Sequence, residues 1–255
     1  TVVGITGTNG KTTTAHMLGA ILTQHGQRTT VLGTLSGTRT TPEAAELQRT
    51  LADERSKGAK AVVMEVSSHA LALQRVAGMQ FAAATFTNLG HDHLDFHRTM
   101  EEYFLAKLRL FTGLTGTSKP NKRAIVNVDD PAGDRIKQLC PAPVWSYGLK
   151  AKADLRAEHV RLSLGGTTFT AATPAGSFSV ESQLVGEHNV YNLLAAIGVA
   201  LHEGATPDQV RQAVAHVTNV PGRFERVMAG QEFTVVVDYA HTEDALVRVL
   251  AAAQT

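Results

Sequence analysis

Short apolar runs recur along the chain up to Gly148, and they alternate with segments whose apolar residues follow a helical period. The short runs predict buried strands at residues 2–6, 29–35, 61–66, 81–87, 124–128 and 144–148. The longer segments predict helices at residues 11–25, 43–57 and 99–111, and another that opens at Asp129-Asp130-Pro131. Because strands and helices alternate, we expect an α/β fold with a mostly parallel sheet flanked by helices.

The pattern changes after Gly148. Residues 153–184 alternate between apolar and polar positions and contain Gly-Gly and Pro-Ala-Gly turns, which predicts a small subdomain of antiparallel β-hairpins. Two amphipathic helices are expected next, at residues 187–202 and 207–216.

Pro221-Gly222 is the expected linker to a second domain. Beyond it, residues 224–228 and 233–237 predict strands and residues 241–253 predict a helix, as in the first unit of a Rossmann-like α/β domain. We therefore expect one domain at residues 1–222 and the beginning of another at residues 223–255. The chain opens on a strand without an initiator methionine and closes within a helical pattern, so we expect a segment of a longer protein.

Composition narrows the class of protein. The 255 residues are 43% hydrophobic, enough for a sizeable core. The formal net charge of +1 gives no electrostatic basis for binding nucleic acid or an anionic membrane. Cys140 is the single cysteine, so no internal disulfide can form, which fits a cytoplasmic location. No apolar run reaches the roughly 20 residues that a membrane span needs.

A glycine-rich segment joins the first expected strand to the first expected helix: Gly4-Ile5-Thr6-Gly7-Thr8-Asn9-Gly10-Lys11-Thr12-Thr13. This context predicts a phosphate-binding loop, because glycines let backbone N–H groups converge on phosphate oxygens at a helix N-terminus. Lys11 would then contact the β- and γ-phosphates, and the Thr12 hydroxyl would bind Mg²⁺. The strict pattern has a glycine where this chain has Ile5. A turn that only closes a strand onto a helix is the alternative.

Two groups of polar residues follow later strands. Glu65 lies at the carboxyl end of the strand at 61–66, where a carboxylate could hold Mg²⁺ or could simply face solvent. The loop after the next strand is dense in metal-binding residue types, namely His91, Asp92, His93, Asp95 and His97. Beside a nucleotide loop we expect Mg²⁺ there rather than zinc. A polar loop held by its own hydrogen bonds is the alternative.

Lys107 interrupts an apolar stripe on its expected helix. Met100, Phe104, Leu108 and Phe111 follow one another at helical spacing, and Lys107 lies on the same face. A lysine in such a place usually extends its ammonium to solvent. Alternatively, burial lowers the pKa of the amine, and the neutral amine reacts with CO₂ to give a carbamate that can bind Mg²⁺. The sequence leaves both possibilities open.

Together these segments resemble the Mur ligase family. Six blocks carry the resemblance, in family order and across nearly the whole chain: Thr6-Gly-Thr-Asn-Gly-Lys-Thr-Thr-Thr14, Met64-Glu-Val-Ser-Ser-His-Ala70, Thr87-Asn-Leu-Gly-His-Asp-His-Leu-Asp95, Tyr103-Phe-Leu-Ala-Lys107, Gly186-Glu-His-Asn-Val-Tyr-Asn192 and Val237-Asp-Tyr-Ala-His-Thr242. No single block is specific, but the set is. The resemblance is strongest to the branch that adds the third amino acid to a UDP-N-acetylmuramoyl peptide.

The resemblance implies roles for individual positions. ATP would be bound by Gly7, Thr8, Asn9, Gly10, Lys11, Thr12, Thr13, His188, Asn189, Arg223 and Asp238. One Mg²⁺ would be held by Thr12 and Glu65, and a second by His93 and carbamylated Lys107. The muramoyl-peptide substrate would be bound by Thr40, Thr41, Ser67 and Arg75. The catalytic residues implied in this way are Lys11, Glu65, His93 and Lys107.

The family's activity implies a two-step reaction. The carboxylate of UDP-MurNAc-L-Ala-D-Glu attacks the γ-phosphate of ATP to give an acyl phosphate, and the amine of an added amino acid then displaces phosphate. The implied partners are these small molecules, and the implied protein is monomeric. Family members have three domains, so the resemblance places the N-terminal UDP-binding domain and most of the C-terminal domain outside this chain. We therefore expect the segment alone to be inactive.

Other functions share parts of this pattern. Folylpolyglutamate and cyanophycin synthetases use the same phosphate loop and the same acyl-phosphate route. A nucleotide-binding relative without catalysis is a second alternative. A GTPase switch is disfavoured, because the chain has no Asn-Lys-x-Asp motif to recognise guanine.

Overall fold

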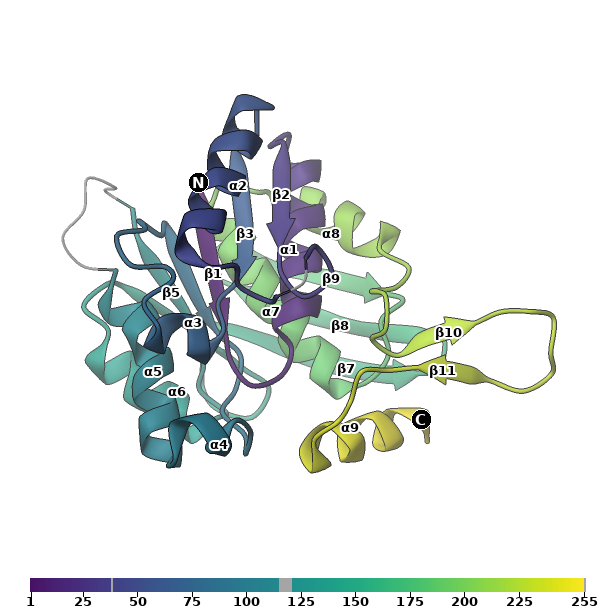
Figure 1. Cartoon of the computed structure of the whole chain (residues 1–255). Helices are drawn as coiled ribbons and strands as arrows, with labels where there is room; N and C mark the ends of the chain where they lie inside the picture. Colours follow the sequence, from purple (N-terminus) through teal and green to yellow (C-terminus); the bar gives the residue numbers. More distant parts are fainter. Residues whose placement is uncertain (38, 115–120, 255) are drawn as a thin grey trace.

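A nine-stranded sheet in the order β2-β3-β1-β4-β5-β6-β7-β8-β9 forms the centre of the molecule (Figure 1). The computed structural model describes residues 1–37, 39–114 and 121–254. The first six strands pair only in parallel; they are β1 (Val2–Thr6), β2 (Thr29–Leu32), β3 (Ala61–Glu65), β4 (Ala83–Phe86), β5 (Arg123–Asn127) and β6 (Val144–Gly148). The expected α/β fold with a mostly parallel sheet is confirmed.

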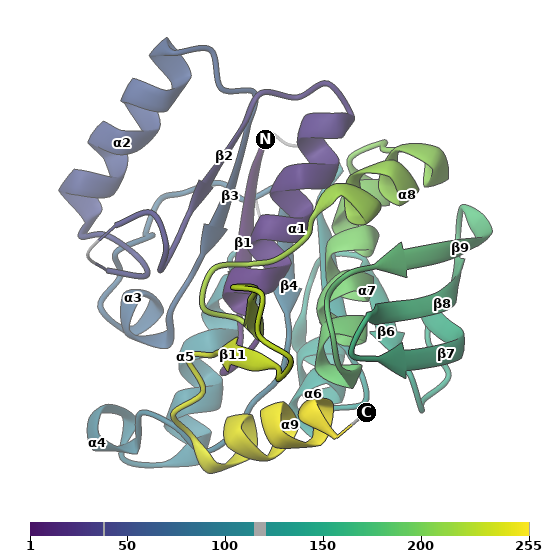
Figure 2. The same cartoon turned by 90° about the vertical axis from the view of Figure 1, so that its right-hand side faces the viewer.

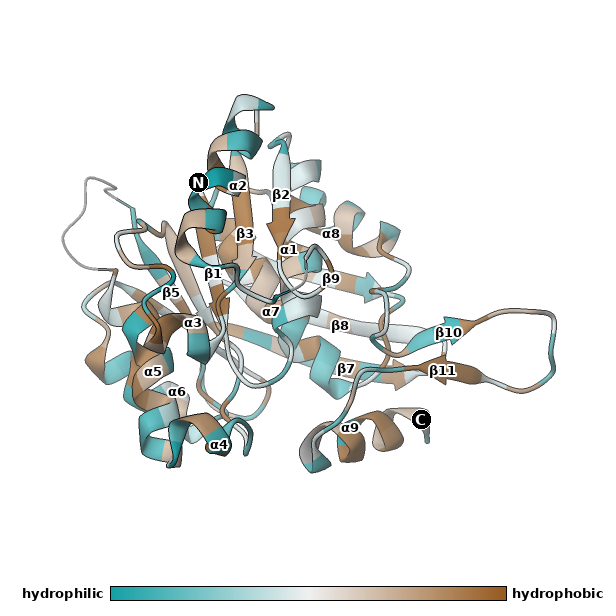
Figure 3. Cartoon of the chain, in the orientation of Figure 1, coloured by the Kyte–Doolittle hydropathy of each residue, from teal (hydrophilic) through white to brown (hydrophobic). Residues whose placement is uncertain are grey.

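Helices cover both faces of this sheet (Figure 2). One face carries α1 (Lys11–Gln24), α7 (Glu187–His202) and α8 (Pro207–His216). The other carries α2 (Ala44–Ser56), α5 (Met100–Thr112) and α6 (Pro131–Leu139). Successive strand residues face opposite sides, so Val63 belongs to the core under α1 and α7 whereas Met64 belongs to the core under α5. The central strands β1 and β3 are accordingly hydrophobic along most of their length (Figure 3).

The antiparallel hairpins expected after Gly148 are present as β7 (Leu155–Ser163), β8 (Gly166–Thr173) and β9 (Gly176–Ser182). They continue the main sheet, because β7 pairs in parallel with β6. Phe169 and Val180 of these strands share the apolar core of α7 and α8. The hairpins are therefore one edge of the sheet and part of the same packed body.

The C-terminal segment, residues 223–254, forms a small unit of its own. It contains the two-stranded sheet of β10 (Glu225–Val227) and β11 (Val235–Val237) followed by α9 (Glu243–Ala253). A small buried cluster of Val185, Phe224 and Ala252 packs the segment against the loop before α7. The β10–β11 hairpin extends away from the main sheet in Figure 1.

Two short helices follow strands at the carboxyl edge of the sheet: α3 (Ser68–Ala72) after β3, and α4 (Leu94–His97) after β4. The strand expected at residues 29–35 already ends at Leu32. The chain turns at Gly33, whose N–H donates to Ser36 Oγ at 2.7 Å. A Cβ at Gly33 would lie 2.1 Å from Glu65 Oε1, so the turn brings the backbone directly onto that carboxylate.

The opposite, amino-terminal edge of the sheet carries a different cluster. The Arg123 guanidinium lies 4.2 Å from the centre of the Trp145 ring, and the His202 ring meets the same indole at 6.1 Å. Arg123 begins β5, Trp145 is the second residue of β6, and His202 ends α7.

In the part of the chain that the structure describes, no helix is long and apolar enough to cross a lipid bilayer.

Candidate active site

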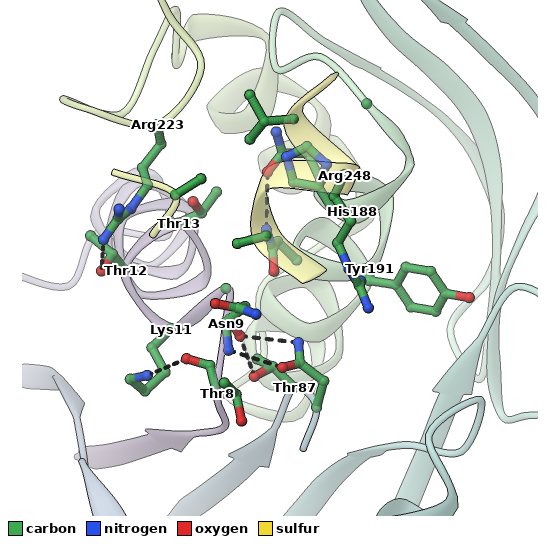
Figure 4. A pocket seen from close by; sticks show the side chains of 18 of the residues that line it. Thr8, Asn9, Lys11, Thr12, Thr13, Thr87, His188, Tyr191, Arg223 and Arg248 are labelled. Carbon is green, nitrogen blue, oxygen red and sulfur yellow. Dashed lines mark hydrogen bonds between the residues drawn. The ribbon is translucent and has the colours of Figure 1, made fainter. Parts of the chain in front are cut away.

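A cavity of about 710 Å³ opens at the carboxyl edge of the sheet, the usual position of ligand sites in such folds. Its wall includes the loop between β1 and α1, residues that follow β2, β4 and β5, the start of α7, and the C-terminal segment. Figure 4 shows Lys11 and Thr12 on one side of it and His188 and Tyr191 on the other. The cavity thus needs residues from both ends of the chain.

The glycine-rich loop has the backbone of a phosphate cradle. Gly10 adopts φ 86° just before α1, a conformation that favours glycine. A Cβ at Gly10 would lie 2.2 Å from Asn192 Oδ1, and one at Gly7 would lie 1.8 Å from Thr87 Oγ1. Both positions therefore exclude any side chain, and the backbone of the loop packs directly against Asn192 and Thr87.

The loop is fixed from the side by the segment after β4. Asn88 Oδ1 accepts the Asn9 N–H at 2.9 Å, and Asn88 Nδ2 donates to the Asn9 carbonyl at 3.1 Å. The Thr87 hydroxyl donates to the same carbonyl at 2.6 Å. The Gly90 N–H donates to Thr8 Oγ1 at 2.9 Å. Thr87 and Asn88 stand in a family block, but only the three-dimensional contacts reveal that they hold the phosphate loop.

Lys11 is one of the basic residues that line the cavity. Its Nζ donates to the carbonyls of Gly7 and Thr8, at 2.9 and 2.8 Å. Burial lowers the pKa of Lys11, the charges of Glu65 and Asp92 oppose this shift, and the charge of Arg223 adds to it.

Glu65 is buried and hydrogen-bonded, so the solvent-facing alternative is wrong. It is 2% exposed, and its Oε2 accepts the Thr12 hydroxyl at 3.0 Å. Its Oε1 accepts the Thr34 N–H at 2.9 Å. Arg223 Nη2 in turn donates to Thr12 Oγ1 at 3.1 Å. A hydroxyl and a carboxylate side by side are oxygen ligands of the kind that Mg²⁺ prefers, so the residues present fit that ion.

Lys107 does not reach solvent. It is 1% exposed, its Nζ donates to the Gly7 carbonyl at 2.8 Å, and the amine lies 4.3 Å from the centre of the Tyr103 ring. Burial lowers the pKa of Lys107 well below its ordinary value, and the charge of Lys11 acts in the same direction. Burial thus acts in the direction that carbamate formation requires, because the uncharged amine is the form that reacts with CO₂.

His93 begins α4 with φ 55° and lies on the rim of the cavity. Its ring meets Tyr103, the residue beneath the Lys107 amine, at 6.1 Å. Burial lowers the pKa of His93, with Asp92 opposing. His97 instead lies inside the protein against Ser68 Oγ at 2.9 Å. Within the described residues no group of three or more His, Cys, Asp or Glu side chains is arranged to hold a metal.

The far wall of the cavity contains the other positions implied for ATP. Burial lowers the pKa of His188 to about 4, against the opposing charge of Asp238. Asn189 donates to the Val185 carbonyl at 2.8 Å and accepts Asn192 Nδ2 at 2.9 Å. The Asp238 carboxylate accepts the N–H groups of Ala240 and Phe224, both at 2.7 Å. All three residues line the cavity.

The four positions implied for the muramoyl peptide gather beside Glu65. Thr41 Oγ1 donates to the Glu65 carbonyl at 2.9 Å and accepts the Ser67 N–H at 3.0 Å. Arg75 Nη1 donates to the Thr41 carbonyl at 3.2 Å. Thr40 lies in the cavity wall nearby. The fold therefore brings the four positions together beside Glu65, and of the four only Thr40 lines the cavity.

Asp129 and Tyr191 line the same cavity, although the sequence predicted no role at the site for either residue. The Asp129 carboxylate accepts the N–H groups of residues 149–151 at 2.6–2.9 Å and the Tyr191 hydroxyl at 2.8 Å. We expected Asp129 only as a first-turn residue, but α6 begins at Pro131 with Asp130 as its cap. Gly148 was an available signal, since a Cβ there would lie 2.9 Å from that carboxylate.

Comparison with known proteins gives consistent matches. Residues 5–200 match the family model described as the Mur ligase middle domain. The chain is 48% identical over 260 residues to UDP-N-acetylmuramoyl-L-alanyl-D-glutamate--2,6-diaminopimelate ligase of Geobacter metallireducens, covering 98% of this chain and 51% of that protein. The ligase of the same name from Geobacillus kaustophilus is 45% identical, with 98% and 53% covered. The chain thus spans about half the length of the curated relatives it matches.

Solved structures give the same picture. A structure of UDP-N-acetylmuramoyl-L-alanyl-D-glutamate--2,6-diaminopimelate ligase matches with a TM-score of 0.85 and 35% identity, covering 99% of this chain and 53% of that one. Folylpolyglutamate synthase of Mycobacterium tuberculosis, complexed with ADP and AMPPCP, matches with a TM-score of 0.75 and 19% identity, covering 99% and 66%. The second likeness is one of fold alone.

Proposed function

The chain belongs to the Mur ligase family, and from this we propose that it is the ATP-using part of a ligase that joins 2,6-diaminopimelate to UDP-N-acetylmuramoyl-L-alanyl-D-glutamate for peptidoglycan synthesis. One observation carries the proposal: the glycine-rich loop and the Thr12–Glu65 pair line one cavity, and the buried Lys107 donates to the Gly7 carbonyl of that loop. The names of the relatives supply the acceptor and the amino acid.

In this proposal the loop residues hold the polyphosphate of ATP. Backbone N–H groups at the start of α1 would point at phosphate oxygens, and Lys11 would exchange its two loop carbonyls for the β- and γ-phosphates. The attack of a substrate carboxylate on ATP brings anionic groups together, so charge stabilisation is the main task of the site. Two Mg²⁺ ions would supply further positive charge at the reacting phosphoryl group. One would be held by Thr12 and Glu65, and the other by His93 and the Lys107 carbamate.

The chemistry proceeds in two displacements. The carboxylate of the muramoyl dipeptide attacks the γ-phosphorus of ATP, the bond to the bridging oxygen breaks, and ADP leaves with the electron pair. The amine of diaminopimelate then attacks the acyl carbon, loses a proton, and phosphate leaves. Thr40, Thr41, Ser67 and Arg75 are proposed to hold the acceptor so that its carboxylate faces the γ-phosphate.

Lys107 is proposed to act as a carbamate. Its neutral Nζ forms a bond to the carbon of CO₂ and loses one proton, which gives an anionic group with two oxygens. The low pKa of the buried amine and its position beside the Gly7 carbonyl support this step.

We further propose that residues 1–222 form the ATP-binding domain and that residues 223–254 begin a second domain that contributes Arg223 and Asp238 to ATP. The bridge between Val220 and Arg223, with Gly222 at φ 65° between them, supports a boundary at this point. A monomer in the cytoplasm, where ATP and nucleotide-linked precursors are available, is the proposed state.

The test uses the whole protein in a phosphate-release assay. Phosphate is expected only when UDP-N-acetylmuramoyl-L-alanyl-D-glutamate, ATP and an amino acid are all present, with diaminopimelate the fastest of a panel that includes lysine and glutamate. Release that depends on a folate and glutamate would instead assign the protein to the folylpolyglutamate synthase type. Absence of release with every combination would favour a nucleotide-binding relative without catalysis.

A further inference from the structure

The Arg223 guanidinium lies beside Thr12, the residue that is proposed to hold Mg²⁺ with Glu65. The guanidinium comes from the C-terminal segment and points at Thr12 across the cavity (Figure 4). Nη2 donates to Thr12 Oγ1 at 3.1 Å, while the Thr12 hydroxyl donates its own proton to Glu65 Oε2 at 3.0 Å. The Tyr239 ring lies 4.9 Å from the guanidinium. Arg223 therefore uses a lone pair of the oxygen that is proposed to bind Mg²⁺.

The charges around Thr12 are already balanced by Arg223. The buried carboxylate of Glu65 and the guanidinium of Arg223 both lie close enough to Lys11 to affect its pKa, and they do so in opposite directions. Asp92 is the other carboxylate that acts on Lys11. A divalent cation added at Thr12 would compete with the guanidinium for one lone pair and would be repelled by both positive side chains.

We propose that Arg223 is the resident cation of the nucleotide-free site and makes binding of a divalent cation depend on a nucleotide polyphosphate. The polyphosphate offers the guanidinium a set of anionic oxygens, which it binds better than a single hydroxyl. Its departure leaves the Thr12 lone pair and the Glu65 carboxylate to the metal. The residue thus selects metal–nucleotide over free metal, an inference that rests on the proposed use of Mg²⁺ and ATP.

The experiment titrates Mn²⁺, a paramagnetic substitute for Mg²⁺, and measures free Mn²⁺ by electron paramagnetic resonance. The unmodified chain is expected to bind Mn²⁺ weakly alone and strongly with the non-hydrolysable analogue AMPPCP. In Arg223→Met, the affinity for Mn²⁺ without nucleotide is expected to rise by about tenfold or more, because one opposing charge is gone. Arg223→Lys, which keeps the charge, is expected to show a smaller rise.

Arg226→Met is the matched control, because Arg226 donates to the Leu164 carbonyl and does not line the large cavity. Its Mn²⁺ affinity is expected to stay unchanged. Adding Thr12→Val to Arg223→Met is expected to abolish the gained binding, which locates it at Thr12. Circular dichroism verifies folding, and Arg223→Gln replaces Met if that variant does not fold.

Unchanged nucleotide-free Mn²⁺ affinity in the folded Arg223→Met and Arg223→Gln variants would overturn the inference. A gain that survives Thr12→Val would do so too, since the new ion would lie elsewhere. Failure of the unmodified chain to bind Mn²⁺ with AMPPCP would instead contradict the proposed function, and the nucleotide-free comparison would still decide the role of Arg223.

Discussion

At the scale of single residues, Lys107 combines full burial with two contacts, neither of which is to a carboxylate. Its amine donates to the Gly7 carbonyl and lies over the Tyr103 ring. Among the ion pairs of the described residues none involves Lys107. A buried ammonium without a carboxylate partner is costly, whereas a neutral amine keeps the same hydrogen bond.

We predict that Lys107→Ala lowers turnover of the whole protein by at least about 100-fold, the usual cost of removing one group that stabilises developing charge. Added bicarbonate is expected not to restore it, because alanine has no amine to modify. Phosphate release measures turnover, and a ¹³C carbamate signal from labelled bicarbonate should vanish in the variant. Lys57→Ala, which removes only a surface pair with Glu54, serves as the control. Full activity of Lys107→Ala would exclude the carbamate.

His97 predicts a dependence of stability on pH. It is 4% exposed, and burial lowers its pKa from 6.5 to about 4, with the charge of His69 adding to the shift. Between those values the unfolded chain takes up a proton that the folded chain does not. The stabilisation is therefore complete above pH 6.5 and declines as the pH falls towards 4.

In His97→Gln, the loss of unfolding free energy between pH 7 and pH 4.5 is expected to shrink by on the order of 2 kcal/mol. Urea unfolding at the two pH values measures it, and the exposed His91→Gln is the control. Equal acid sensitivity in the two variants would show that other groups dominate.

At the scale of elements, β2 ends at Leu32 and the chain turns at Gly33, and the role of this turn can be tested. A Cβ at Gly33 would lie 2.1 Å from Glu65 Oε1, so Gly33→Ala must displace that carboxylate from Thr12. We predict a loss of about 10- to 100-fold in affinity for Mg²⁺ with AMPPCP, the usual effect of disturbing the surroundings of a metal ligand. Gly37→Ala in the same loop has no neighbour closer than 3.9 Å and should have no effect. Calorimetric titration compares the two, and equal affinities would argue against a metal-binding role for Glu65.

Local signals determined which elements could be predicted from sequence. The helices α7 and α8 begin and end where expected, because Gly186 precedes one and Thr206 with Pro207 starts the other through a capping box. The helices α3 and α4 were not expected, since elements of five and four residues show no period. The strand expected at 29–35 is too long, because its end depends on Glu65, which is remote in sequence.

At the scale of the whole molecule, the sequence was informative where a motif is continuous and uninformative where distant segments meet. The glycine-rich loop between β1 and α1 could be predicted from ten consecutive residues of the chain. The contact between Arg223 and Thr12 joins residues 211 positions apart, and nothing local predicts it. The same holds for Asp129, whose carboxylate holds residues 149–151 and Tyr191.

A prediction at this scale concerns the polypeptide limited to residues 1–255. We expect it to bind ATP, because the positions implied for the nucleotide, apart from Gly7, line the described cavity. We also expect no ligation by it, since the relatives whose names specify the reaction are about twice as long. Calorimetry with AMPPCP tests the first expectation, and ADP release tests the second, with the whole protein as positive control. ADP release by the polypeptide that requires both the muramoyl dipeptide and diaminopimelate would contradict the prediction.

The position of Trp145 determines which changes in the protein can be followed by tryptophan fluorescence. It is the only tryptophan of the chain, and it lies with Arg123 and His202 at the sheet edge opposite the cavity. Its fluorescence should therefore report global unfolding and remain insensitive to nucleotide. Tyr239, in contrast, lines the cavity and contacts the Arg223 guanidinium. Tyr239→Trp in a Trp145→Phe background would place the sole fluorophore beside the moving cation and make its displacement visible in a stopped-flow trace.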